Sequence, residues 1–248
     1  MADYDNRLVR GTTSGVLTVD AGLRAHMLRV YNYMVGALAL TGVVAWLTAN
    51  SPLMNVLYQQ VASAHGVALQ PTILGWVVLL APLGLVFFLS FRIAQMSYSA
   101  AQATFWVYAA LVGASLASIF AVYTGASIAT TFFVTAATFG TMSLWGYTTG
   151  RDLTGFGSFL MMGLFGIIIA MVVNFFFQSA AVNFVVSILG VLIFTGLTAY
   201  DTQKIKNFYS AGEDGSIAGK KAIMGALSLY LDFLNIFLFL LRFMGNRR

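Results

Sequence analysis

Two aspartates near the C-terminal end of the chain are the residues best suited to chemistry. Asp201 ends one apolar stretch, and Asp232 lies in the middle of the next, ten residues after Ala222. In a helix this offset places Asp232 roughly 15 Å along the axis. A carboxylate so deep in a membrane costs at least about 2.5–3.5 kcal/mol, so it must face a bundle interior, water or a partner. We therefore expect a functional site at Asp232; a hydrogen-bonded acid that only fixes helix packing is the alternative.

The neighbours of Asp232 in the sequence favour a polar site shared with Asp201. Ser228 at i−4 and Asn235 at i+3 lie on the same helix face and are candidate supporting residues. The connection between the two stretches lets their helices pack as antiparallel neighbours, so the two carboxyls can meet. Such carboxyls cannot readily both ionise, and they titrate as one unit. The pair could sense pH, bind Ca²⁺ through hard oxygen ligands or perform acid–base chemistry.

A basic residue, Arg92, follows the second apolar stretch on the same predicted side of the membrane as Asp201. One interpretation is an ordinary cationic anchor at the membrane surface. The other is a latch, in which the Arg92 guanidinium holds Asp201 ionised and closes that end of the bundle. The residues alone leave both interpretations open.

The composition indicates which kind of element positions these residues. Hydrophobic residues make up 59% of the 248 residues and charged residues only 8%, whereas a soluble domain carries about 25% charged residues. Lipid can surround such a surface, because hydrocarbon needs no polar groups against it. The chain has no cysteine, which excludes disulfides and thiolate chemistry. The net charge of +5 does not indicate a nucleic-acid partner, since the basic residues lie in short loops between apolar stretches.

The sequence therefore predicts an all-α polytopic membrane protein with seven transmembrane helices. Each stretch is close to the roughly 20 apolar residues that a spanning helix needs. Residues 1–25 read as a polar cytoplasmic tail, and residues 26–248 form the transmembrane domain. The predicted spans are Met27–Ala49, Thr72–Phe91, Ala101–Tyr123, Ser127–Tyr147, Gly155–Phe177, Ala181–Tyr200 and Ala222–Met244.

The loop charges predict the orientation. The loops after the first, third and fifth spans carry no Lys or Arg. The positive-inside rule therefore places the N-terminus in the cytoplasm. Seven spans would leave Gly245–Arg248 outside, with two arginines on the wrong side for that rule; the alternative is six spans and a last segment that re-enters the membrane. Ten basic residues fall on the predicted cytoplasmic side: Arg7, Arg10, Arg24, Arg29, Arg92, Arg151, Lys204, Lys206, Lys220 and Lys221.

Three segments of the sequence resemble the transmembrane Bax inhibitor motif family, also called the Bax inhibitor-1 family, in a form that looks bacterial. One is similar to the family's loop between its fourth and fifth helices, and it runs Gly146-Tyr147-Thr148-Thr149-Gly150-Arg151-Asp152-Leu153. Another resembles the end of the sixth helix, and it runs Tyr200-Asp201-Thr202-Gln203-Lys204-Ile205. The third resembles the last helix, and it runs Ala226-Leu227-Ser228-Leu229-Tyr230-Leu231-Asp232-Phe233-Leu234-Asn235-Ile236-Phe237 and on to Leu240-Leu241-Arg242.

The resemblance implies a seven-helix bundle with the last helix at its centre, enclosed by the other six. It also implies a pH-sensitive Ca²⁺ leak in which Asp201 and Asp232 form the sensor and calcium-binding site and Arg92 is the latch. Calcium would be the transported or bound ion, with no other cofactor and no enzymatic activity. The expected surroundings are the lipid bilayer, in a bacterial inner membrane. Some bacterial relatives interact with a membrane-bound AAA protease, which is a candidate partner here.

Two other functions compete with the leak. An intramembrane aspartyl protease also places Tyr-Asp on one helix and an aspartate on the next, and Tyr200-Asp201 fits that pattern. The second motif does not, because Tyr230-Leu231 stands where those enzymes have a glycine-rich approach to the second aspartate. The remaining alternative is a non-conducting regulator, in which the aspartate pair only sets the conformation and the surface binds a membrane protease or another partner.

Overall fold

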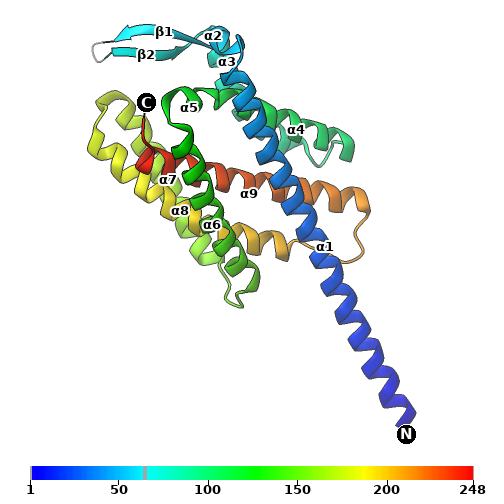
Figure 1. Ribbon diagram of the computed structural model, residues 1–248. Helices are drawn as coiled ribbons and strands as arrows, with labels where there is room; N and C mark the ends of the chain where they lie inside the picture. Colours follow the sequence, from blue (N-terminus) through cyan, green and yellow to red (C-terminus); the bar gives the residue numbers. More distant parts are fainter. Residues whose placement is uncertain (1, 64–65, 248) are drawn as a thin grey trace.

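The computed structural model describes residues 2–63 and 66–247, with side chains described for residues 21–61 and 69–247 (Figure 1). Over this part of the chain the structure is helical apart from one β-hairpin. The elements are α1 (Ala2–Ala49), α2 (Leu53–Leu57), β1 (Tyr58–Ser63), β2 (Gly66–Pro71), α3 (Ile73–Arg92), α4 (Tyr98–Ser115), α5 (Ala117–Val122), α6 (Gly125–Thr148), α7 (Thr154–Phe177), α8 (Ala180–Asn207) and α9 (Gly215–Met244).

Seven of these segments are long and apolar enough to cross a membrane, which confirms the predicted all-α polytopic fold. The last span is one continuous helix of 30 residues, roughly 45 Å long at 1.5 Å per residue. It therefore crosses rather than re-enters, and the two termini lie at opposite ends of the molecule (Figure 1). The C-terminal segment is fixed at its end of the bundle by the Asn246 N–H, which donates to Ser127 Oγ at 2.9 Å. Arg248 lies outside the described residues.

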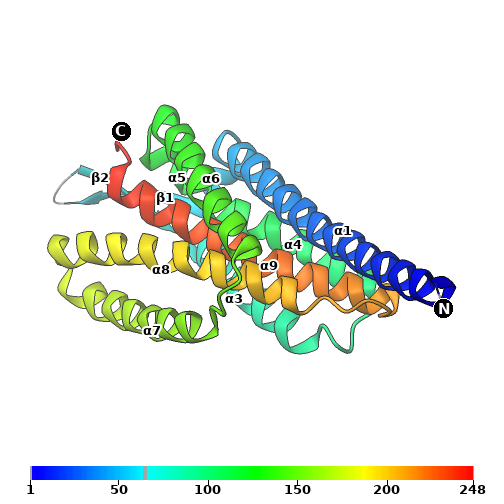
Figure 2. The ribbon, with the colours of Figure 1, turned by 90° about the horizontal axis from the view of Figure 1, so that it is seen from below.

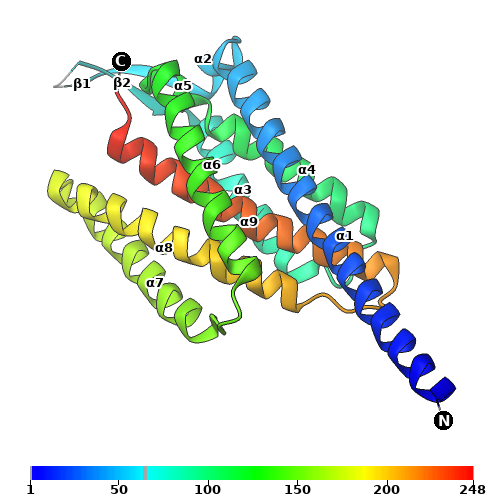
Figure 3. The ribbon, with the colours of Figure 1, turned by 60° about the horizontal axis from the view of Figure 1, so that its bottom comes forward.

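The last helix is central, as predicted, but four of the other spans and not all six form its main contacts. In α9, 61% of the most apolar window is buried, against 17% for α3 and for α7. Helix α9 packs against α8, α1, α6 and α4, whereas α3 packs mainly on α4 and α7 on α8 (Figures 2 and 3). Four helices therefore form the main wall around α9, and α3 and α7 flank this wall on the outside.

The hairpin between the first two spans is a difference from the sequence prediction, which had no strand. Strands β1 and β2 pair antiparallel with Tyr58 opposite Pro71. The buried Tyr58 hydroxyl donates to the Ser115 carbonyl oxygen at 2.9 Å, which anchors the hairpin to the end of α4. An isolated hairpin is only marginally stable in water. The contact with α4 therefore explains why a strand pair forms here although the local sequence pattern does not predict one.

The N-terminal end of α1 extends beyond the predicted span. Residues 2–25, which belong to the predicted polar tail 1–25, have a helical backbone that continues into the membrane segment. Within the residues whose side chains are described, Ala21–Ala49 of α1 is long and apolar enough to span a membrane, and this segment contains the predicted span Met27–Ala49.

A close approach of α6 and α8 fixes the position of the helix that carries Asp201. Gly146 of α6 lies against the backbone of Ala199, where an added Cβ would be 2.2 Å from the carbonyl oxygen. Only glycine permits this distance, because small residues let transmembrane helices pack backbone to backbone. Ala199 is two residues before Asp201, so this contact determines where the site lies relative to α6.

Candidate functional site

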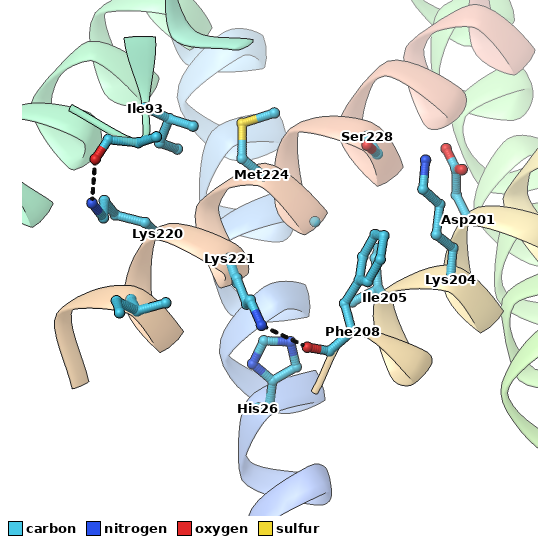
Figure 4. Close-up of a pocket in the computed structure, with 13 residues that line it drawn as sticks. His26, Ile93, Asp201, Lys204, Ile205, Phe208, Lys220, Lys221, Met224 and Ser228 are labelled. Carbon is cyan, nitrogen blue, oxygen red and sulfur yellow. Dashed lines mark hydrogen bonds between the residues drawn. The ribbon is translucent and has the colours of Figure 1, made fainter. Parts of the chain in front are cut away.

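A cavity of about 610 Å³ opens at the lysine-rich end of the bundle. It lies between the α3–α4 connection, the C-terminal end of α8 and the N-terminal half of α9 (Figure 4). Asp201 and Ser228 belong to its lining, with Ser228 on α9 facing the α8 residues (Figure 4). The structure therefore places one predicted acid and one predicted supporting residue in the same cavity.

Asp232 lies one helical turn deeper in α9 than Ser228. Its side chain is only 4% exposed, and its Oδ2 atom is buried without a hydrogen-bond partner. The charged group that acts on it electrostatically is Asp201. The structure thus brings the two predicted acids together, with Asp201 at the cavity and Asp232 behind it.

The antiparallel packing of α8 and α9 produces this arrangement. Gly225 packs against Ile205 near the lysine-rich end, and Gly190 packs against Phe239 near the other end. Because both helices rise 1.5 Å per residue, this register puts Asp201 level with the turn of α9 that leads to Asp232. These two contacts, each between a glycine and a large side chain, therefore align the two carboxyls.

Arg92, the predicted latch, lies beside this cavity and does not contact Asp201. It is exposed at the end of α3, next to Ile93, which lines the cavity. Among the described residues the one salt bridge joins Lys221 and Glu213. The cation that acts on Asp201 is Lys204 from the following turn of α8. The latch role of Arg92 stays a prediction that needs the end of α3 to move.

The second predicted supporting residue, Asn235, is partly satisfied within its own helix. Its amide Nδ2 donates to the Leu231 carbonyl oxygen at 2.8 Å. The side-chain oxygen lies one turn further from the cavity than Asp232. Of the two supporting residues, Ser228 is therefore the one placed to act together with Asp201.

A glutamine that the sequence analysis did not single out holds the α6–α7 loop against α8. Gln203 Oε1 accepts from the Leu153 N–H at 2.8 Å, and its Nε2 donates to the Arg151 carbonyl oxygen at 2.7 Å. Gln203 is two residues after Asp201, so the same turn of α8 carries a site residue and a clamp. Gln203 belongs to the Tyr200–Ile205 motif, but its hydrogen-bond partners lie about 50 residues away in the sequence and cannot be inferred from that motif.

A chain of hydroxyl groups links three helices near the site, and the sequence did not predict it. The Tyr31 hydroxyl and Ser143 Oγ are 2.5 Å apart. Ser143 Oγ is 2.9 Å from Thr202 Oγ1, which donates to the Thr198 carbonyl oxygen at 2.7 Å. These bonds tie α1 and α6 to the turn of α8 that carries Asp201.

The charges around the cavity are mainly positive. Lys204, Lys220 and Lys221 line it together with Asp201, and the ring of the buried His26 lines it from α1. The sequence showed these lysines as loop charges, and only the packing of α8 on α9 gathers them. Asp201 is therefore a single acid at a basic entrance.

The described residues offer a divalent cation few ligands. They contain no group of three or more His, Cys, Asp or Glu side chains placed to hold a metal. Ca²⁺ takes six to eight oxygen ligands, so Asp201, Asp232 and the Ser228 hydroxyl would need water or carbonyl oxygens beside them. Such a set would hold a divalent cation weakly.

The fold and this aspartate pair define a seven-helix integral membrane protein with a polar site between its last two helices. A model of the family described as Inhibitor of apoptosis-promoting Bax1 matches residues 23–248. The chain therefore belongs to the Bax inhibitor-1 family, as its motifs predicted.

Bacterial relatives agree with this assignment. Inner membrane protein YbhL of Escherichia coli strain K12 is 48% identical over 231 residues, which cover 92% of this chain and 94% of YbhL. An uncharacterized protein of Rickettsia prowazekii strain Madrid E is 46% identical over an alignment of 249 residues that covers all of both chains. The protein YrjE of Lactococcus lactis is 36% identical over 224 residues, covering 90% of this chain and 92% of YrjE.

Proposed function

We propose that this protein is a pH-sensitive calcium leak whose sensor is the pair Asp201 and Asp232. The observation that carries the proposal is the buried Asp232 carboxylate, with Oδ2 unpartnered and Asp201 as its electrostatic neighbour. Two carboxylates in such surroundings are stable when a proton or a cation lies with them. A calcium ion passing between α8 and α9 would supply that charge, and Asp201 would receive it at the cavity.

Protons enter the mechanism in two opposing ways. Ca²⁺ binding needs ionised carboxylates, so acid conditions reduce occupancy of the pair. Ionised Asp201 can also attract Arg92 from the end of α3, which would close the cavity, and protonation would release it. The cations that line the same cavity are Lys204, Lys220 and Lys221, and the titratable His26 lies there on α1. Flux should therefore pass through a maximum between acid and alkaline conditions.

We further propose that the lysine-rich end, with the N-terminus, faces the cytoplasm of a bacterial inner membrane. The positive-inside rule supports the orientation, and the name of the YbhL relative supports the membrane. In this orientation the cavity that contains Asp201 opens toward the cytoplasm. Calcium would then reach Asp232 from outside and leave past Asp201.

The test is calcium uptake into dye-loaded liposomes between pH 6 and pH 8. We expect uptake above that of empty liposomes, with a pH dependence that Asp201→Asn and Asp232→Asn both remove. Arg92→Gln should raise uptake at the alkaline end, where the latch would be closed. Met224→Leu is the matched control, because it changes the cavity wall without removing a charge or a possible ligand.

Uptake no greater than in empty liposomes, from protein that remains folded, would reject the leak. That outcome would favour a non-conducting regulator, in which the pair sets the conformation and the surface binds a membrane-bound AAA protease or another partner. An Asp201→Asn profile identical to that of the unmodified protein would reject the gating role of Asp201 alone.

A further inference from the structure

The cavity at the lysine-rich end combines cations with an apolar wall and an exposed apolar rim. Its wall includes Ile205 and Met224 between the lysines. At its rim Phe208 is 57% exposed and Ile217 is 47% exposed. Large apolar side chains exposed beside lysines at a membrane surface are typical of a site for an amphiphile.

Two of the lysines keep their charge available. Lys204 Nζ lies over the rings of Tyr200 and Phe208, 5.8 and 5.9 Å from their centroids. Lys220 Nζ donates only to the carbonyl oxygens of Ala94 and Met96, at 3.1 and 3.3 Å. Within the described part of the chain neither forms a salt bridge.

The third lysine has a different role. Lys221 pairs with the Glu213 carboxylate and donates to the Phe208 carbonyl oxygen at 3.0 Å. Its charge is therefore largely compensated, and it holds the α8–α9 loop in place. Among the described residues, the positive charge of the cavity that no salt bridge compensates comes from Lys204 on one wall, with Asp201 near it, and from Lys220 on the other (Figure 4).

We propose that this cavity binds the headgroup of an anionic phospholipid from the leaflet at the lysine-rich end. The ammonium groups of Lys204 and Lys220 each have at least one N–H free for a phosphate oxygen, since an ammonium has three donors. The acyl chains would leave over Phe208 and Ile217 into the surrounding lipid. The bound lipid would lie against the wall that contains Asp201 and between α8 and the end of α3.

The apolar lining distinguishes this ligand from a free anion. A soluble phosphate would bind the lysines and leave the exposed side chains of Phe208 and Ile217 uncovered. A phospholipid would cover these two side chains with its glycerol backbone and the first methylenes, and burial of apolar surface adds to the attraction between charges. Binding of a lipid at this cavity does not require that the protein conducts calcium.

Competitive lipid binding tests the proposal. The protein is reconstituted with equal amounts of phosphatidylglycerol and phosphatidylcholine, extracted gently, and its retained lipids are counted by native mass spectrometry without calcium. We expect retained phosphatidylglycerol to exceed phosphatidylcholine. A lysine near an anionic headgroup contributes about fivefold in affinity, so Lys204→Gln with Lys220→Gln should reduce the preference about 25-fold.

The control variant is Arg151→Gln, which removes one charge from the exposed α6–α7 loop at the same end of the bundle. It should keep the preference, because Arg151 does not line the cavity. If the double variant is poorly folded, Lys204→Gln alone serves, since its exposed side chain has no hydrogen bond within the described residues. The preference of that single variant for phosphatidylglycerol should fall about fivefold.

Three results would overturn the proposal. One is equal retention of the two lipids by the unmodified protein. Another is an equal loss of preference in Arg151→Gln, which would show a diffuse surface effect. The third is displacement of phosphatidylglycerol by millimolar inorganic phosphate, which would show that the cavity recognises a free anion. None of these results depends on whether the protein conducts calcium.

Discussion

Replacing Gly146 by alanine perturbs the contact that positions the Asp201 helix. The new Cβ would lie 2.2 Å from the Ala199 carbonyl oxygen and 2.8 Å from its Cα and C atoms. These are backbone atoms, so no side-chain rotation can relieve the overlap. Helices α6 and α8 must separate by roughly 1 Å to restore normal contact distances.

Another glycine of α6 provides the matched control. Gly140 has no atom within 4 Å of the position that a Cβ would occupy. Both substitutions gain the same helix propensity, about 1 kcal/mol for alanine over glycine. The difference between the two variants therefore isolates the overlap, which for an overpacked core costs about 1–3 kcal/mol. Because the overlapping Ala199 atoms belong to the backbone and cannot repack, we expect the cost of the overlap in Gly146→Ala to lie in the upper half of that range.

Unfolding by SDS in mixed micelles, followed by tryptophan fluorescence, measures the two free energies. Gly140→Ala should be as stable as the unmodified protein or slightly more stable, and Gly146→Ala should be clearly less stable. Equal stabilities of the two variants would refute the inferred backbone contact of α6 with α8. Calcium uptake should change in Gly146→Ala only, since Asp201 follows the contact by two residues.

Three further substitutions test individual hydrogen bonds by the same unfolding assay. Gln203→Ala should lose about 1–3 kcal/mol, because two backbone groups of the α6–α7 loop lose their partner; unchanged stability would mean that the clamp is replaced by water. Tyr230→Phe should lose about 1 kcal/mol through its 2.7 Å hydrogen bond with Thr41, and no loss would contradict that bond. Hydrogen bonds from the Thr154 hydroxyl and N–H hold the pKa of Asp152 below its usual 3.8. The resulting stabilisation is complete well above pH 3.8 and disappears as the pH falls through the lower, folded-state pKa. Asp152→Asn should therefore reduce stability at pH 6 and have less effect at pH 3, and an equal effect at both would contradict hydrogen bonding of Thr154 to the ionised carboxylate.

The sequence was sufficient to predict the spans and the neighbouring positions of the two acids. Apolar length identifies a membrane helix directly, because hydrocarbon excludes polar residues from its surface. The same exclusion identifies Asp232 as a candidate site residue, since a carboxyl in the middle of a span is costly in lipid and is retained mainly at functional sites. The neighbouring position of Asp201 followed from the order of two consecutive helices. These inferences need only local patterns and chain connectivity.

The features that the sequence did not predict depend on how the helices rotate and approach. The clamp by Gln203 joins groups about 50 residues apart, and no local period encodes such a bond. The lysines of the cavity appeared as loop charges, because their convergence depends on the packing of α8, α9 and the α3–α4 connection. The predicted ion pair of Arg92 with Asp201 is absent for the same reason: the position of α3 depends on α4. The hairpin from Tyr58 to Pro71 depends on an anchor at the end of α4.

The central claim is that Asp201 and Asp232 act as one calcium site. Calcium uptake into liposomes at a single pH, for Asp201→Asn, Asp232→Asn and the double variant, tests it by a double-mutant cycle. If the pair is one site, either single variant removes most of the uptake and the double variant loses little more. Losses that multiply, so that the double variant falls by the product of the two single effects, would show two independent residues and contradict the account.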